Sequence, residues 1–154
     1  MSLSLLRLMS SDISARDHEA VRVGVDIQAI SPFDAHSEPL SDAIQDRVFT
    51  ETEREYCEGQ RDPQQHYAVR WAAKEAFVKL LEVNETPSYH EINIIKDGAK
   101  PRVALDTEAQ TALCRSFGVQ SPGDIALDVT LSHDRDADVA LAEIYALNRR
   151  KRNE

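Results

Sequence analysis

A short stretch of the sequence, residues 71–81, places three charged side chains among apolar and small ones. Lys74, Glu75 and Lys79 stand within WAAKEAFVKLL, whose other positions are typical of a helix that is buried on most sides. A charge in such surroundings is costly unless it is paired or bound to a ligand. Side chains four residues apart share a helix face, so Glu75 neighbours Lys79. Arg70 and Lys74 have the same spacing and form an adjacent basic stripe.

Two interpretations of these charges stand at this point. One is an amphipathic helix with a surface salt bridge and a solvated basic edge. The other is a site for a magnesium-bound diphosphate, with Glu75 as a metal ligand and the neighbouring cations on phosphate oxygens. Magnesium takes one or two protein carboxylates and completes its octahedron with phosphate oxygens and water.

Two further positions carry candidate chemistry. Asp26, near the end of an alternating segment, is either a second metal carboxylate or an ordinary strand-end aspartate. The sequence LSHD brings Ser132 and His133 to the junction of a predicted strand and a turn. Taken in isolation, His133 is more typical of a partly buried, hydrogen-bonded histidine than of a ligand-binding one. None of these signals decides the function alone.

The elements that must position these residues can be predicted from periodicity. Residues 21–30, VRVGVDIQAI, alternate with a period of two, which predicts a strand with its valines on the core face and Asp26 on the opposite face. Thr50 and Glu53 have capping-box spacing at the start of a helix. Asp62 at the N-cap and Pro63 at the first helical position predict a helix that runs to about Glu82.

The second half of the chain predicts two hairpins separated by a helix. Strands within 91–105 are joined by a turn around Asp97 and Gly98, and a helix from Asp106 or Thr107 ends at Gly118. Strands on either side of HDRDAD follow, and the last of them is apolar on both faces. Such a strand is expected to be covered on both faces, by its own helices or by another subunit.

Composition restricts the classes of function. The chain has 154 residues and a formal net charge of −9, with 42% hydrophobic and 29% charged residues. These values fit one globular domain that binds neither nucleic acid nor an anionic membrane. Two widely spaced cysteines and the lack of a membrane-spanning run predict a cytoplasmic protein. We expect an N-terminal extension at 1–20, one domain at 21–147 and a basic tail at 148–154.

Five segments, in this order, resemble the 4'-phosphopantetheinyl transferases, and by length and spacing the short holo-acyl-carrier-protein synthases. The segments are GVDIQAI, FTETEREYC, RWAAKEAFVKL, DGAKPRV and LSHDRDADVALAEI, and the likeness extends from about Val21 to Leu147. The resemblance implies an α+β fold of a single module, in which an antiparallel sheet packs against a long helix. It also implies a homotrimer with coenzyme A between adjacent subunits.

The resemblance further implies a magnesium-dependent enzyme that moves 4'-phosphopantetheine from coenzyme A to a serine of an acyl carrier protein, leaving adenosine 3',5'-bisphosphate. By motif position, Asp26 and Glu75 are the metal ligands, and Glu75 is the first candidate for orienting the base. The implied coenzyme-contacting residues are Arg70, Lys74, Lys79, Ser132 and His133, and the implied catalytic residues are Glu75, Asp26 and Lys79.

Two alternatives stay open beside this prediction. One is a related enzyme whose carriers belong to polyketide or peptide synthesis, and the other is a non-catalytic module that keeps the fold. The segment after the first strand is rich in acids, whereas the resemblance implies a basic helix there for an acidic carrier. Arg47, Arg54 and Arg61 are the cations available in that region.

Overall fold

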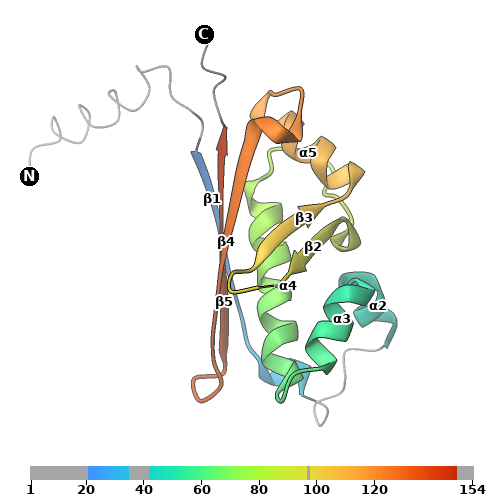
Figure 1. Cartoon of the computed structure of the whole chain (residues 1–154), viewed down its shortest axis with the longest axis vertical. Helices are drawn as coiled ribbons and strands as arrows, with labels where there is room; N and C mark the ends of the chain where they lie inside the picture. The colour runs from blue at the N-terminus through green and yellow to red at the C-terminus, as the bar shows by residue number, and fades with distance from the viewer. Residues whose placement is uncertain (1–20, 35–41, 97, 149–154) are drawn as a thin grey trace, which may run out of the picture.

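The computed structural model describes residues 21–34, 42–96 and 98–148, and within them two antiparallel sheets pack against one long helix (Figure 1). The predicted α+β architecture is confirmed. The strands are β1 (Val21–Gln28), β2 (Ile92–Ile95), β3 (Arg102–Leu105), β4 (Ile125–Asp134) and β5 (Val139–Asn148). The α-helices are α2 (Asp42–Val48), α3 (Glu51–Glu58), α4 (Pro63–Leu80) and α5 (Thr107–Phe117). Short 3-10 turns lie at η1 (Ser31–Phe33), η2 (Tyr89–Glu91) and η3 (Pro122–Asp124).

The larger sheet has the strand order β1-β5-β4, and all its pairs are antiparallel. In its register Asp26 lies opposite Ala142 and His133 opposite Ala140. The smaller sheet is the β2–β3 hairpin. Helix α4 contacts both sheets, and the helices lie on one side of the larger sheet (Figure 1).

Small residues on α4 allow the larger sheet to approach it closely. Ala72, Ala73 and Ala76 are fully buried, as are alternate residues of β5. The closest approach is at Gly24 of β1, where an added Cβ would lie 1.8 Å from the carbonyl oxygen of Ala76. Only glycine fits this crossing, so Gly24 determines where β1 sits on the helix.

The face of β1 was predicted wrongly. Its glycine and polar residues face α4, and its four apolar residues point away from the core. Alternation shows which residues share a face, but it does not show which face meets the core. The close contact at Gly24, together with hydrogen bonds from Arg22 to the carbonyl oxygens of Leu80 and Ser116, holds the polar face against the helix.

Strand β5 is apolar on both faces, as predicted, and its two faces have different surroundings. The face toward α4 is buried, since Ala140, Ala142, Ile144 and Ala146 are fully inaccessible. On the opposite face Tyr145 is 41% exposed and lies beside Val23, which is 49% exposed. The outer apolar face, as we call it, comprises Val21, Val23, Val25, Ile27 and Tyr145.

Most of the local predictions around α4 are confirmed. Thr50 and Glu53 form a reciprocal capping box at the start of α3. Helix α4 begins at Pro63 and ends at Leu80, two residues before the predicted end. Asp62 occupies the N-cap position without a capping hydrogen bond, and its carboxylate instead lies 3.7 Å from Arg135 Nε.

The extension at 1–20 lies outside the described residues, as does the basic tail at 148–154 apart from Asn148, which ends β5. The turn residue Asp97 is also outside them. None of the helices in the described ranges combines the length and the apolar character that a bilayer span requires.

Candidate functional site

Asp26 is the first site residue that the fold places. The inner face of β1 carries it onto the C-terminal half of α4, where its Oδ1 accepts a hydrogen bond from Lys79 Nζ at 2.8 Å. Lys79 Nζ also donates to the carbonyl oxygen of Val25 at 2.9 Å. The second oxygen, Oδ2, accepts from Gln28 Nε2 at 2.6 Å. Asp26 is 12% exposed and Lys79 is 51% exposed, so this carboxylate is sheltered while its cation reaches solvent.

Glu75 lies one helical turn before Lys79 on α4 and is half-buried. Its Oε1 accepts a hydrogen bond from the hydroxyl of Tyr89, the first residue of η2. Burial raises the pKa of Tyr89, and the hydrogen bond to Glu75 and the charges of Glu75 and Asp26 raise it further. Asp26 pairs with Lys79, which follows Glu75 by four residues on the same face of α4, so the two carboxylates lie in one neighbourhood.

The donor set at this point fits a divalent cation that shares its coordination with a substrate. Two carboxylates are the number that magnesium takes from a protein when phosphates and water complete its octahedron. In the described part of the chain, no group of three or more His, Cys, Asp and Glu side chains could hold a metal without such help. The ammonium of Lys79 lies against Asp26, so this carboxylate already has a positively charged partner.

Lys74 lies in the interior, away from this site. Its side chain is fully inaccessible and its Nζ lies 2.8 Å from Glu53 Oε2, in an equally buried ion pair. The same nitrogen donates to the carbonyl oxygens of Tyr89 and Ile92, so its three protons have partners. Burial lowers the pKa of Lys74 while Glu53 opposes that shift. The predicted phosphate contact is not compatible with this placement, because the ammonium is enclosed and fully bonded.

Arg70 is also buried, at 1% exposure, which does not match the predicted phosphate contact. Its guanidinium lies 4.1 Å from the centre of the Tyr56 ring on α3, and its Nη1 donates to the carbonyl oxygen of His66. The basic stripe of Arg70 and Lys74 exists as predicted, but it faces α3 and the β2–β3 hairpin rather than solvent. These two cations hold neighbouring elements together.

His133 lies near the end of β4, exposed, with its ring 5.4 Å from that of His66 on α4 in an edge-to-face arrangement. Burial lowers the pKa of His66 to about 4, and the charges of His133, Arg70 and Lys96 add to this effect. His66 precedes Glu75 by nine residues, which is about 14 Å along a helix at 1.5 Å per residue. One chain therefore holds its histidine pair and its carboxylates as two separate groups.

Ser132 is exposed and lies opposite Leu141, on the face of the sheet away from His133. The pair proposed from sequence is thus divided by strand alternation.

Two residues beside these groups were missed by sequence reasoning, namely Tyr89 and His66. Each is linked to a predicted site residue only through the tertiary fold: Tyr89 to Glu75, and His66 to His133. The hydroxyl of Tyr89 reaches Glu75 from 14 positions away in the sequence. Neither lies in a pattern of spacing that signals a site.

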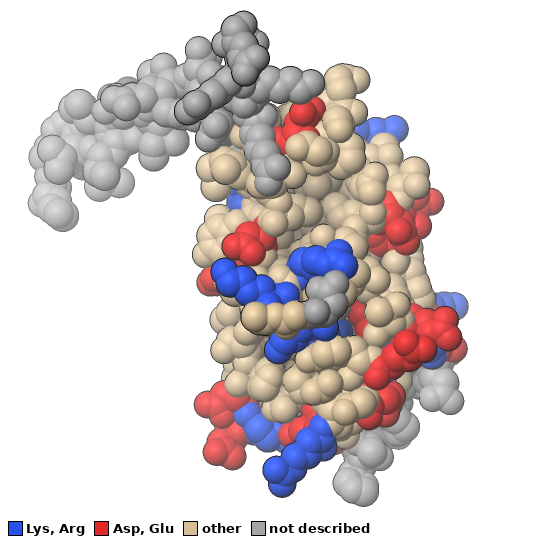
Figure 2. Space-filling view, in the orientation of Figure 1, with Lys and Arg blue, Asp and Glu red and all other residues tan. Residues whose placement is uncertain are grey.

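Lysine and arginine side chains gather in the middle of one face, and acidic side chains flank them (Figure 2). The β2–β3 hairpin supplies Lys96, Lys100 and Arg102, which are all exposed. The charge of Lys96 contributes to the lowered pKa of His66. A local basic region thus exists on a chain with a net charge of −9.

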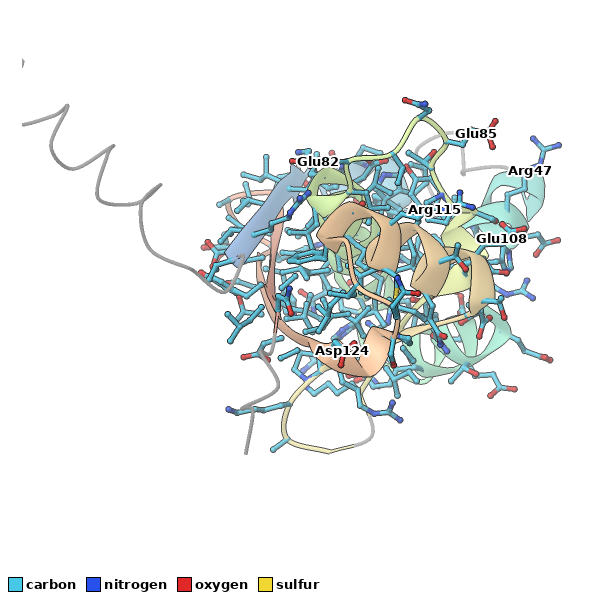
Figure 3. The ribbon with its side chains drawn as sticks, turned by 90° about the horizontal axis from the view of Figure 1, so that it is seen from above. Arg47, Glu82, Glu85, Glu108, Arg115 and Asp124 are labelled. Carbon is cyan, nitrogen blue, oxygen red and sulfur yellow. The ribbon has the colours of Figure 1, made fainter. Side chains whose placement is uncertain are left out.

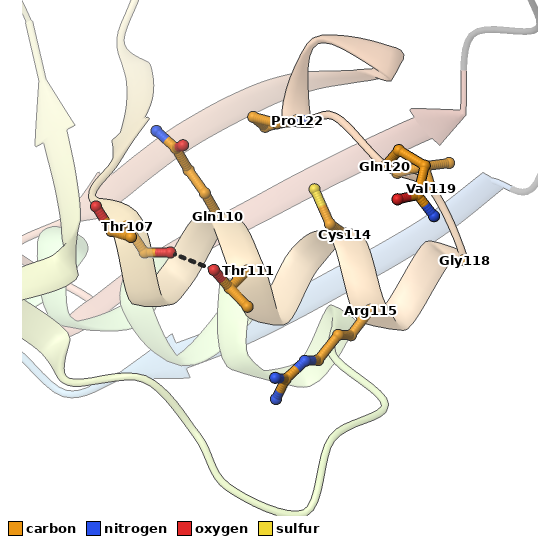
Figure 4. Close-up of a pocket in the computed structure, with 9 residues that line it drawn as sticks. All are labelled: Thr107, Gln110, Thr111, Cys114, Arg115, Gly118, Val119, Gln120 and Pro122. Atoms are coloured by element: carbon orange, nitrogen blue, oxygen red, sulfur yellow. Dashed lines mark hydrogen bonds between the residues drawn. The ribbon is translucent and has the colours of Figure 1, made fainter.

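Two hollows flank α5, and neither contains the predicted site residues. One of about 670 Å³ lies between α5 and the loop at 82–87, where Figure 3 labels Glu82, Glu85, Glu108 and Arg115. The other, of about 470 Å³, is an open groove along α5 that includes Cys114 and Arg115 (Figure 4). Asp26 and Glu75 lie outside both hollows and are partly buried, and Lys79 is the member of this group that reaches solvent.

The fold and site define a single-module α+β protein that presents two carboxylates and an ammonium at a sheet–helix junction. Residues 22–137 match the family model of the 4'-phosphopantetheinyl transferase superfamily. The chain belongs to this superfamily, and the family, fold and enzyme class predicted from the sequence are confirmed.

Individual relatives agree with this assignment. A holo-[acyl-carrier-protein] synthase from Geobacter sp. strain M21 is 36% identical over 121 residues, which cover 77% of this chain and 92% of the relative. The ACPS–CoA complex of Chronobacterium ammoniagenes has a TM-score of 0.66 at 30% identity and covers 86% of this chain and all of the other. The fatty acid synthase subunit alpha of Schizosaccharomyces pombe is 32% identical over 140 residues, which are 88% of this chain but 7% of that protein.

Proposed function

We propose that this chain is a holo-acyl-carrier-protein synthase that transfers 4'-phosphopantetheine from coenzyme A to a serine of an acyl carrier protein, with magnesium held by Asp26 and Glu75. The observation that supports the metal assignment is the ion pair of Asp26 with Lys79, which follows Glu75 by one turn on the same face of α4. The names of the relatives and the coenzyme in a related structure support the choice of reaction.

The reaction joins the serine oxygen to the phosphorus nearest the pantetheine and breaks the bond to the bridging oxygen of the diphosphate, so that adenosine 3',5'-bisphosphate leaves. It requires positioning and charge neutralisation more than covalent participation by the protein. When bound, magnesium supplies Lewis-acid neutralisation of the phosphate oxygens. Asp26 and Glu75 would hold it, and the Asp26–Lys79 ion pair beside Glu75 on α4 supports this assignment.

Lys79 has the freedom that a phosphate contact demands. It is half exposed, and its bond to Asp26 is a surface ion pair of the kind worth about 0–1 kcal/mol. An anion beside Asp26 can therefore draw the ammonium away at little cost. Lys79 would then neutralise negative charge on the diphosphate as the bond to the leaving group lengthens.

His133 serves a different part of the coenzyme in this proposal. Its partner His66 is about 14 Å from Glu75 along α4, which is too far for both residues to hold one phosphate. Coenzyme A carries a ribose 3'-phosphate besides its diphosphate, so the histidine pair and Lys96 have an anion to bind. Alternatively, His133 contacts the coenzyme A that is bound at the carboxylates of an adjacent subunit.

The proposal includes a homotrimer. Val21, Val23, Val25 and Ile27 are 41–62% exposed along β1, and Tyr145 continues this apolar area onto β5. A contiguous exposed apolar surface of this kind is typical of a subunit interface. In this proposal coenzyme A lies between adjacent subunits.

We place the protein in the cytoplasm, where thiols stay reduced, because Cys57 and Cys114 are both unpaired. The likeness to a fungal fatty acid synthase subunit supports a carrier of fatty-acid synthesis as the acceptor.

The test is the mass of an apo-carrier protein after incubation with coenzyme A and the full chain. We expect the carrier to gain one phosphopantetheine group with magnesium and none with EDTA. Glu75→Gln should slow this gain far more than tenfold, a factor that corresponds to about 1.4 kcal/mol. A fatty-acid carrier and a polyketide carrier run in parallel would identify the preferred acceptor. A carrier of unchanged mass in every reaction would contradict the proposal.

A further inference from the structure

The hydroxyl of Tyr89 lies beside Glu75, although none of the sequence motifs includes this tyrosine. It donates a hydrogen bond to Glu75 Oε1. The bond occupies one carboxylate oxygen of Glu75 and leaves Oε2 for a cation.

Tyr89 is itself held by the core. Its carbonyl oxygen accepts a hydrogen bond from the buried Lys74 Nζ at 2.8 Å, and that nitrogen is paired with Glu53. Its ring packs against Trp71 with the two centres 6.2 Å apart. Backbone and side chain are thus fixed at separate points, so the direction of the hydroxyl is set before any ligand arrives.

The same buried network reaches three elements. Glu53 Oε1 accepts from the backbone N–H of Ile94 on β2, and its Oε2 accepts from Thr50 at the start of α3. A continuous set of hydrogen bonds therefore runs from α3 through Lys74 to Tyr89 and ends at Glu75. Buried polar networks whose members all have partners are rigid.

We propose that Tyr89 is a positioning residue whose hydroxyl orients the carboxylate of Glu75 for the metal. The inference rests on the function proposed above and adds to it a residue outside the recognised motifs. Partners that orient a metal ligand commonly contribute 10- to 100-fold to metal affinity or activity. Free of this bond, the Glu75 side chain would sample other rotamers and would bind a cation less often in the productive geometry.

The experiment compares Tyr89→Phe with a matched control in the full-length protein. Tyr89→Phe keeps the ring against Trp71 and removes only the hydroxyl. The control is Tyr67→Phe, which removes a similar bond from Tyr67 on α4 to Glu58 Oε1 at 2.7 Å, in another part of the fold. Manganese is the probe, because its free concentration can be measured by electron paramagnetic resonance while coenzyme A is present and the carrier is absent.

We expect Tyr89→Phe to raise the dissociation constant for manganese about tenfold or more. It should lower kcat for transfer by a similar factor and leave KM for the carrier unchanged. Tyr67→Phe should match the wild type in metal affinity, even if both variants lose similar thermal stability. Saturating magnesium should partly restore transfer by Tyr89→Phe, which a merely structural role would not allow.

Glu75→Gln separates failure of this inference from failure of the proposed function. If Glu75→Gln loses manganese while Tyr89→Phe binds it as tightly as the wild type, Tyr89 has no positioning role and the metal site stands. If Glu75→Gln and the wild type bind manganese equally, the proposed metal site is wrong and the role of Tyr89 falls with it. Equal weakening by Tyr89→Phe and Tyr67→Phe would also overturn the inference, because the effect would then be one of stability.

Discussion

Gly24 and Ala76 meet where β1 crosses α4, and a side chain at Gly24 would begin 1.8 Å from the carbonyl oxygen of Ala76. This contact fixes the position of β1 along the axis of α4. Two residues further along β1, Asp26 reaches Lys79, which is three positions beyond Ala76 on α4. The position of Asp26 against α4 therefore depends on glycine at position 24, because a Cβ there would collide with the backbone of Ala76.

We predict that Gly24→Ala lowers the free energy of unfolding by about 1–3 kcal/mol, because backbone cannot give way as a flexible side chain does. Urea unfolding monitored by circular dichroism measures this. Gly98→Ala is the matched control, since no atom lies within 4 Å of the Cβ it would add. The control should stay within about 0.5 kcal/mol of the wild type. Equal stability of the two variants would mean that the crossing is not tightly packed.

Lys74 and Lys79 stand five positions apart on α4 and should fail in different ways when replaced by methionine. Lys74→Met leaves Glu53 buried without its cation, a change that typically costs about 3–5 kcal/mol of stability. Lys79→Met removes a surface pair worth about 0–1 kcal/mol, but it should lower the transfer rate at least tenfold. Denaturant unfolding and initial transfer rates distinguish the two effects. Normal transfer by Lys79→Met would remove this residue from the proposed site.

The outer apolar face gives a prediction about assembly. Val23→Lys introduces a charge beside Tyr145, in the area that we assign to the subunit interface. The variant should run as a monomer in light scattering and should lose transfer activity, while its circular dichroism is unchanged. Gln120→Lys adds the same charge at an exposed position in the groove along α5 and should remain a trimer. A monomeric wild type would contradict the assignment at once.

His66 predicts a pH dependence of stability. Its pKa is about 4 in the folded chain and 6.5 when unperturbed, so between these values the unfolded state binds more protons. The contribution is fully present above pH 6.5 and is lost as pH falls toward 4. The groups that act on His66 are His133, Arg70, Lys96 and Asp62.

The variant His66→Gln should therefore lose less stability than the wild type between pH 6.5 and 4. We expect a difference of about 1 kcal/mol or less, because solvent screens a half-buried ring. If the wild type and His66→Gln lose equal stability between pH 6.5 and 4, the prediction is wrong and His66 has an ordinary pKa in the folded chain.

Much of the fold around the site could be predicted because its signals are local. A capping box requires only Thr50 and Glu53, and Pro63 marks the start of α4. The turn residues between β4 and β5 are equally local. The candidate carboxylates Asp26 and Glu75 could be named because each stands out against apolar neighbours in the sequence.

Orientation and pairing could not be predicted in the same way. From the sequence alone, the two faces of an alternating strand are equivalent. The close approach of Gly24 to Ala76, which distinguishes them, depends on the tertiary fold. The sequence favours a ligand-binding role for Lys74 because its partner Glu53 lies on another helix, where the spacing from Thr50 predicts only a capping role for that carboxylate. The carboxylate of Glu53 both caps α3 and pairs with Lys74, and nothing in the local sequence indicates the pairing.

The central claim is that Asp26 and Glu75 bind one metal ion, and anomalous diffraction tests it most directly. Crystals grown with coenzyme A and manganese should show a single anomalous peak in contact with one oxygen of each carboxylate, at about 2.1 Å if the ion adopts magnesium-like geometry. The two carboxylates are expected from the same chain, because Asp26 pairs with Lys79 one helical turn after Glu75. A peak that contacts only one of them, or no peak at a site where coenzyme A is bound, would contradict the account.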